Sequence, residues 1–145
     1  MRKNSVRLVR AGRSTFRQTK VSRAQVIRHY KDMIVWQRSI ELVVECYDFT
    51  RSFPAGERFN LTSQIRRAAV SIPSNIAEGQ GRSHRKELLH HISISRGSLQ
   101  ELETLVIIAE RLGYAAAEDL KRARELCDEV GRMLAGLRRS LATSH

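Results

Sequence analysis

LTSQIRRAAVSIPSNIAEGQGR, residues 61–82, is the stretch that decides the fold of this chain of 145 residues. Its apolar side chains recur every three or four positions, which on an α-helix places them on one face that can be buried. Pro73 interrupts the pattern, because its ring removes a backbone hydrogen bond and crowds the carbonyl of Ala69, at a cost of about 3 kcal/mol. The apolar face comprises Leu61, Ile65, Ala68, Ile72 and Ile76.

The segment around the proline still favours a helix. Ser71, Ser74 or Asn75 can satisfy the carbonyl that the proline leaves free, because short polar side chains bond to nearby backbone. Two glycines follow, and glycine is the residue that most often closes a helix at a positive φ. We therefore expect a kinked helix that ends at Gly79, with Gly79 or Gly81 in the left-handed region.

A stripe of polar side chains lies beside the apolar face, and two interpretations of it stay open. In the first, Arg67 and Glu78 form ion pairs, with each other or across a subunit boundary, that fix an assembly. In the second, the stripe and nearby basic residues bind RNA, because the planar arginine fork suits phosphate. The stripe comprises Gln64, Arg67, Ser71, Asn75 and Glu78, and the basic residues are Arg66, Arg67, Arg82, Arg85 and Lys86.

A first helix is expected before this stretch, over residues 32–52, with Asp32 as its N-cap and an apolar face of Trp36, Ile40, Val43, Val44 and Tyr47. Pro54 ends it and begins a turn. Phe53 and Phe59 flank that turn, where both can pack over the end of the bundle.

Two more helices follow, each with apolar residues at alternating spacings of four and three, which is a heptad pattern. Ser83 is the expected N-cap of the third helix and Gly113 its stop, and the fourth begins within residues 116–118. Asn60 or Thr62 caps the second helix. We call such a row of positions a seam. The seam of the third helix comprises Leu88, Ile92, Ser95, Leu99, Leu102, Val106 and Ala109, and the seam of the fourth helix comprises Leu120, Ala123, Cys127, Val130, Leu134, Leu137 and Leu141.

Short connections make consecutive helices antiparallel neighbours, so we expect an all-α, up-down-up-down four-helix bundle. Six apolar residues lie off the two seams. A wide apolar stripe is normal for a globular helix, but such residues also suit a subunit contact, and we expect oligomerisation with cyclic closure. The six are Leu89, Ile94, Leu105, Ile108, Leu126 and Met133.

Four segments, in order, resemble the bacterial four-helix bundle proteins known as 23S rRNA intervening-sequence proteins. The resemblance covers residues 30–141. It implies a four-helix bundle, association with RNA, and homo-oligomers, pentamers by preference, with no assigned reaction. The segments are DMIVWQRSIELV (32–43), FPAGERFNLTSQ (53–64), TSQIRRAAVSIPSNIAEGQGR (62–82) and SRGSLQELETLVIIAERLGY (95–114).

The net charge of +11 is concentrated at one end of the chain. Residues 1–31 contain ten Lys or Arg and no acidic residue, whereas residues 32–145 contain sixteen basic and fifteen acidic residues, a balance of +1. We therefore divide the chain into a basic N-terminal arm, residues 1–29, and a bundle domain, residues 30–145. The arm is a disordered tail, or a segment upstream of a native start near Tyr30, or an element that orders on RNA through Arg7, Arg10, Arg13 and Arg17.

The sequence lacks the motifs of common enzyme classes: it has no phosphate-binding loop, no HExxH and no nucleophile elbow. Glu87 and His90 are similar to one half of a di-iron site, but the chain has no second Glu-x-x-His pair to complete it. Cys46 and Cys127 lie within apolar patterns and are expected to be reduced core residues. We expect no enzyme activity, no catalytic residue, no metal or other cofactor and no small-molecule substrate.

These patterns favour a non-enzymatic, homo-oligomeric, RNA-binding bundle in the cytoplasm. No apolar run approaches the roughly 20 residues that span a bilayer, so we expect no membrane partner. The alternative is a structural or protein-interaction scaffold without a nucleic-acid ligand. The near-neutral bundle favours the scaffold, and the basic arm favours RNA.

Overall fold

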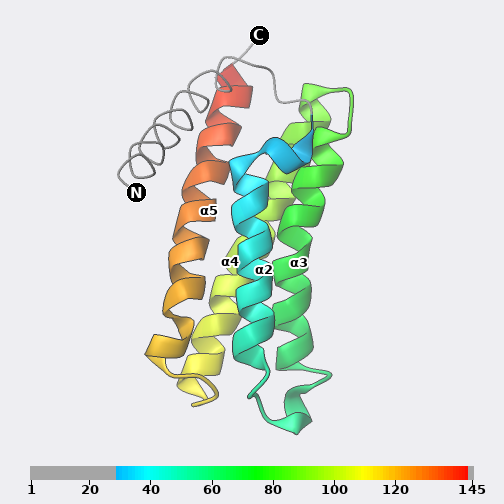
Figure 1. The fold of residues 1–145 in the computed structure, drawn as a ribbon. Helices are drawn as coiled ribbons and strands as arrows, with labels where there is room; N and C mark the ends of the chain where they lie inside the picture. Colours follow the sequence, from blue (N-terminus) through cyan, green and yellow to red (C-terminus); the bar gives the residue numbers. More distant parts are fainter. Residues whose placement is uncertain (1–28, 144–145) are drawn as a thin grey trace, which may run out of the picture.

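Four helices form the described part of the chain, residues 29–143 of this computed structural model, and pack as a bundle (Figure 1). They are α2 (Ile34–Thr50), α3 (Leu61–Gln80), α4 (Arg85–Arg111) and α5 (Ala117–Thr143), with 3-10 turns η1 (Tyr30–Asp32) and η2 (Ala55–Glu57). Each helix contacts the next in the chain, and α5 returns to contact α2. The expected all-α four-helix bundle is confirmed, and residues 1–28 of the N-terminal arm lie outside the described residues.

The core lies along the predicted seams of α4 and α5 and the predicted apolar face of α3, but not along the predicted face of α2. On α4 and α5 the central seam positions are buried, and the last two seam residues of α5, Leu137 and Leu141, are half-buried. Burying a Leu or Ile side chain contributes about 1.5–3 kcal/mol, so these buried positions stabilise the bundle. The fully buried aliphatic side chains are Leu42, Ile65, Ile72, Ile76, Ile92, Leu102, Leu120, Leu126, Val130 and Leu134.

Two of the predicted N-caps are wrong. Asp32 belongs to η1, and Met33 precedes α2, because the amide of Met33 bonds the carbonyl of Tyr30 at 3.0 Å and closes a separate turn. His84, not Ser83, precedes α4. At both positions, turns closed by backbone hydrogen bonds determine where the helix begins, and the preferred capping residue does not.

The N-cap of α3 is Asn60, one of the two expected residues, but its side chain makes no capping hydrogen bond. The carboxylate of Glu57 instead accepts from the amide of Leu61 at 3.2 Å. A residue of the preceding turn therefore satisfies one of the free amides at this helix end.

The helix α3 continues through Pro73 and ends one residue later than expected, at Gln80. The prediction of a positive φ at Gly79 or Gly81 is wrong: Gly81 has φ −77°, and within residues 29–143 only Gly113 has a positive φ, of 79°. Gly79 is instead required for packing, because a Cβ at this position would lie 2.7 Å from the Cβ of His91. This glycine allows α3 and α4 to approach closely.

The off-seam apolar residues divide between the core and the surface. Leu105 and Leu126 are buried in the bundle, so the expectation that they form a second surface is wrong; the stripe is simply wide. Ile94 and Ile108 are exposed on α4.

The expected apolar face of the first helix is wrong: Ile40, Val44 and Tyr47 are exposed, whereas Leu42, Cys46 and Phe49, which recur at helical spacing too, are buried. Spacing alone does not choose between the two sets. The exposed apolar face of α2 and α3 comprises Ile40, Val44, Tyr47 and Val70.

Candidate functional site

The middle of the polar stripe lies in the contact between α3 and α4. The side chain of Asn75 is 3.0 Å from Nδ1 of His91 and donates to the carbonyl of Ser71 at 2.9 Å. The hydroxyls of Ser71 and Ser98 share a hydrogen bond of 2.8 Å. These groups bind one another, so they position the two helices and are not free to contact a ligand.

A second hydrogen bond joins the same two helices in the core. Ser95 is a fully buried polar residue of the α4 seam, and its hydroxyl donates to the carbonyl of Ile72 at 3.0 Å. A buried hydroxyl needs such a partner, because an unpaired one costs about 1–3 kcal/mol. The α3–α4 contact therefore combines close packing at Gly79 with directional bonds that fix its register.

The two ends of the stripe are exposed to different degrees and are separate from each other. Glu78 pairs with Arg82 at 2.9 Å, one helical turn away, so the predicted pairing of Glu78 with Arg67 inside the chain is not formed. Gln64 donates to the side chain of Asn60 at 3.0 Å. Arg67 is exposed. The stripe is thus not one continuous network.

The predicted basic residues form two clusters at opposite ends of α3. Arg66 and Arg67 lie near its N-terminus, whereas Arg82, Arg85 and Lys86 lie in and after the turn to α4. At 1.5 Å rise per residue, the two clusters are about 20 Å apart along the axis. Arg82 is also held by Glu78, so the second cluster is partly neutralised. Arg7, Arg10, Arg13 and Arg17 lie outside the described residues.

Arg66 is fixed in place where α2 ends. Its guanidinium lies 4.4 Å from the ring centroid of Tyr47, and its Nε donates to the hydroxyl of Thr50 at 3.0 Å. An arginine stacked on an aromatic ring has less rotamer freedom than a solvated one. This stack was not predicted, although an Arg on one helix and a Tyr on the preceding helix are a usual cation–π pair.

The turn between α2 and α3 separates two phenylalanines that the sequence treats alike. Phe53 is buried, with ring centroids 6.0 Å from Phe49 and 5.5 Å from Tyr114. Phe59 is 87% exposed, so its predicted packing over the bundle end is wrong. The guanidinium of Arg58 lies 5.6 Å from the centroid of the Phe59 ring. Phe59 precedes α3 off the register of its apolar face, which is the signal that it faces solvent.

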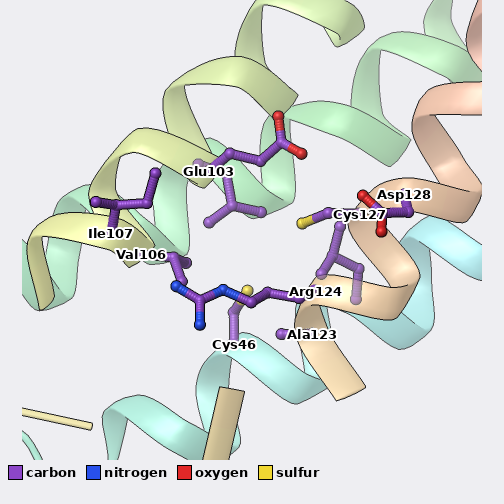
Figure 2. Close-up of a pocket in the computed structure, with 10 residues that line it drawn as sticks. Cys46, Glu103, Val106, Ile107, Ala123, Arg124, Cys127 and Asp128 are labelled. Carbon is purple, nitrogen blue, oxygen red and sulfur yellow. The ribbon is translucent and has the colours of Figure 1, made fainter. Parts of the chain in front are cut away.

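A cavity of about 360 Å³ opens between α4 and α5 over α2 (Figure 2). Its apolar wall includes Leu42 and both cysteines, and Glu103 and Asp128 supply carboxylates. Partial burial and then the neighbouring charge of Asp128 raise the pKa of Glu103. Arg124 also lines the cavity, but its guanidinium is paired with Glu110 at 2.6 Å.

The two cysteines of the cavity are free thiols, as expected. Burial raises the pKa of Cys127 to about 12 and raises that of Cys46 as well. A thiol that stays protonated at neutral pH is a poor nucleophile and a poor metal ligand. Within residues 29–143, no group of three or more His, Cys, Asp or Glu side chains is arranged to hold a metal ion.

Comparison with known proteins identifies the family. Residues 31–136 match the model of the 23S rRNA-intervening sequence protein family. The chain belongs to this family. Its fold is similar to a crystal structure of a protein of unknown function from the S23 ribosomal protein family of Bacteroides thetaiotaomicron, with 22% identity and a TM-score of 0.65. That match covers 72% of this chain and 98% of the other.

No functionally curated protein matches the chain. In residues 29–143 no helix is long and apolar enough to cross a bilayer. The family match and the structural match establish the family and the fold of this chain. A ligand has to be inferred from the residues of the chain itself.

Proposed function

We propose that this protein is a non-enzymatic, homo-oligomeric bundle that binds RNA in the cytoplasm. The observation that supports RNA binding is the distribution of charge: ten basic and no acidic residues in residues 1–31, beside a bundle whose formal balance is +1. Each phosphate that a Lys or Arg neutralises releases counterions, which favours binding of a strand without any enzyme chemistry. The arm and the exposed arginines near each end of α3 make the contacts.

The exposed apolar face of α2 and α3 supports assembly with further copies of the chain. Val44 is 62% exposed, and Ile40, Tyr47 and Val70 are exposed beside it. Next to them a shallow groove of about 280 Å³ is lined mainly by apolar side chains, including Trp36 and Pro73. An apolar face of this kind suggests a protein contact. Cyclic closure, with a pentamer as the favoured form, gives every copy the same buried face.

Assembly strengthens RNA binding through multivalency. One arm provides only sequence-independent phosphate contacts, which are weak at physiological salt. Several arms on one ring that engage one strand bind with an avidity well above that of a single arm. The two halves of the proposal therefore support each other.

The proposal is tested by measuring RNA affinity across a salt series, for the full chain and for a chain that begins at Tyr30. We expect the full chain to bind with an affinity that falls steeply with salt but discriminates between a single strand and a hairpin. Removal of the arm should cost about ten-fold or more at low salt and flatten the salt dependence. Oligomer mass, recorded on the same samples, should stay unchanged.

The alternative is a structural or protein-interaction scaffold without a nucleic-acid ligand. It is favoured by the middle of the polar stripe, where Ser71 and Asn75 are bound within the chain to Ser98 and His91. Under this alternative, RNA binding is indiscriminate, disappears near physiological salt and is lost with the arm. That outcome would replace the RNA-binding proposal.

A further inference from the structure

Phe59 is presented to solvent by a turn that is held from two sides. The carboxylate of Glu57 accepts from the amide of Leu61 at 3.2 Å and from the hydroxyl of Tyr114 at 2.9 Å, which ties the turn to α3 and to the far end of α4. Backbone hydrogen bonds of 2.9 Å from Glu57 to Pro54 and from Asn60 to Glu57 close the same turn. Phe59 is therefore displayed by an ordered loop, at 87% exposure.

An aromatic ring held in water in this way loses the free energy of burial, which for a Phe side chain is about 1.5–3 kcal/mol. Phe53, at the start of the same connection, is buried against Phe49 and Tyr114, so this connection buries one phenylalanine and leaves the other in solvent. The contrast between the two residues indicates that Phe59 is positioned for a partner.

Basic residues lie on both sides of Phe59 in the sequence. Arg58 lies over it, and Arg66 and Arg67 follow within the first two turns of α3. Arg66 is held by Tyr47 and Thr50, so its charge is fixed in place. Asp48 is paired with Arg51 at 3.0 Å, and the carboxylate of Glu57, which keeps its charge, is directed to the hydroxyl of Tyr114 and the amide of Leu61.

We propose that Phe59 is a stacking platform for an unpaired RNA base, with Arg58, Arg66 and Arg67 binding the flanking phosphates. The inference rests on the proposed RNA binding and names its ligand class, a single strand or an unpaired loop. Aromatic rings stack on splayed bases of any sequence, whereas a duplex keeps its bases covered. A second copy of this turn is a poorer partner, because it brings like-charged arginines together.

The inference is tested with full-length Phe59→Ala and two RNA probes, an oligouridylate and an abasic strand of the same length. We expect the wild type to bind the oligouridylate more tightly and Phe59→Ala to lose about five-fold or more of that affinity. Binding of the abasic strand should not change. The salt dependence should stay the same in Phe59→Ala, since no charge is removed, and become shallower by about one phosphate contact in Arg58→Ala.

Two control variants separate stacking from a general loss of apolar surface. Phe59→Trp should keep the preference for bases, and the fluorescence of its indole should be quenched by oligouridylate but not by the abasic strand. Ile107→Ala removes an exposed apolar side chain of α4, on a different part of the surface, and should bind both probes like the wild type.

Each other outcome counts against a defined statement. If the wild type binds both probes and Phe59→Ala binds them equally well, the stacking platform is wrong and RNA binding stands. If Phe59→Ala changes oligomer mass but not RNA affinity, the ring is a subunit contact. If the wild type binds neither probe at low salt, the proposed function itself has failed.

Discussion

Glu103 is a single residue whose surroundings make a pH-dependent prediction. Burial beside the cavity and the charge of Asp128 raise its pKa in the folded protein, so the ionised form is disfavoured there. Its contribution to stability is therefore fully present below the pKa of the unfolded chain and is lost as pH rises through the folded pKa. Glu103→Gln should raise the free energy of unfolding at about pH 7, but only by up to about 0.5 kcal/mol, because the side chain is partly buried and solvent still screens its charge.

Urea unfolding at about pH 7 and about pH 4 checks this prediction. The advantage of Glu103→Gln should shrink at the lower pH, where the wild-type carboxyl is protonated. Glu101→Gln, at an exposed position on the same helix, is the matched control and should change stability little at either pH. An advantage of Glu103→Gln that grows on acidification would show that the charge of Glu103 is stabilising.

Among single residues, the sequence predicts burial well on α3, α4 and α5 but wrongly on α2, and it predicts side-chain partners poorly. The seam positions Ile92, Leu102 and Val130 are buried as their spacing requires, since period alone determines which face they occupy. Phe53 and Phe59 have the same residue type and adjoin the same turn, yet only one is buried, because the turn's hydrogen bonds to Tyr114 and Leu61 decide the outcome. Tyr114 is distant in the sequence, and the partner in Leu61 is a backbone amide. A local sequence pattern therefore cannot predict either hydrogen bond.

At the scale of elements, the close contact of α3 with α4 is tested at Gly79. A Cβ at this position would lie 2.7 Å from the Cβ of His91, which is too near for either helix backbone to stay in place. Gly79→Ala should therefore lower the free energy of unfolding by about 1–3 kcal/mol, although alanine is the better helix former. Thermal or urea unfolding measures the change.

Gly97→Ala on α4 is the matched control for this substitution. Gly97 lies inside α4, the helix that Gly79 of α3 contacts, and a Cβ at position 97 would have no atom within 4 Å. Alanine should raise stability by about 0.5–1 kcal/mol, through helix propensity alone. If both variants are stabilised, the helices are not closely packed at Gly79.

The helices themselves were predictable, and their ends were not. Apolar spacing located all four, and Gly113 ends α4 with a positive φ as expected. At Asp32 and Ser83 the favoured capping residue lies one or two positions away from the observed start, because neighbouring backbone hydrogen bonds form first turns of their own. Pro73 is tolerated inside α3 because the helix is packed in the bundle, where tertiary contacts outweigh a local penalty.

For the whole molecule, the exposed apolar face of α2 and α3 predicts how the chain assembles. Val44→Glu adds a charge at the centre of that face, and burying it in a subunit contact would be costly without a partner. We expect the variant to lose the oligomer, as measured by light scattering, while its helical circular dichroism stays unchanged because Val44 is 62% exposed in the single chain.

Ile107→Glu provides the comparison that makes this prediction specific to one face. Ile107 is 48% exposed on α4, at the rim of the cavity and away from the α2–α3 groove. The same change in charge at this position should leave the oligomer mass unaltered. Loss of the oligomer in Ile107→Glu but not in Val44→Glu would move the subunit contact to the α4 surface, beside Ile94 and Ile108, where the sequence pattern first suggested it.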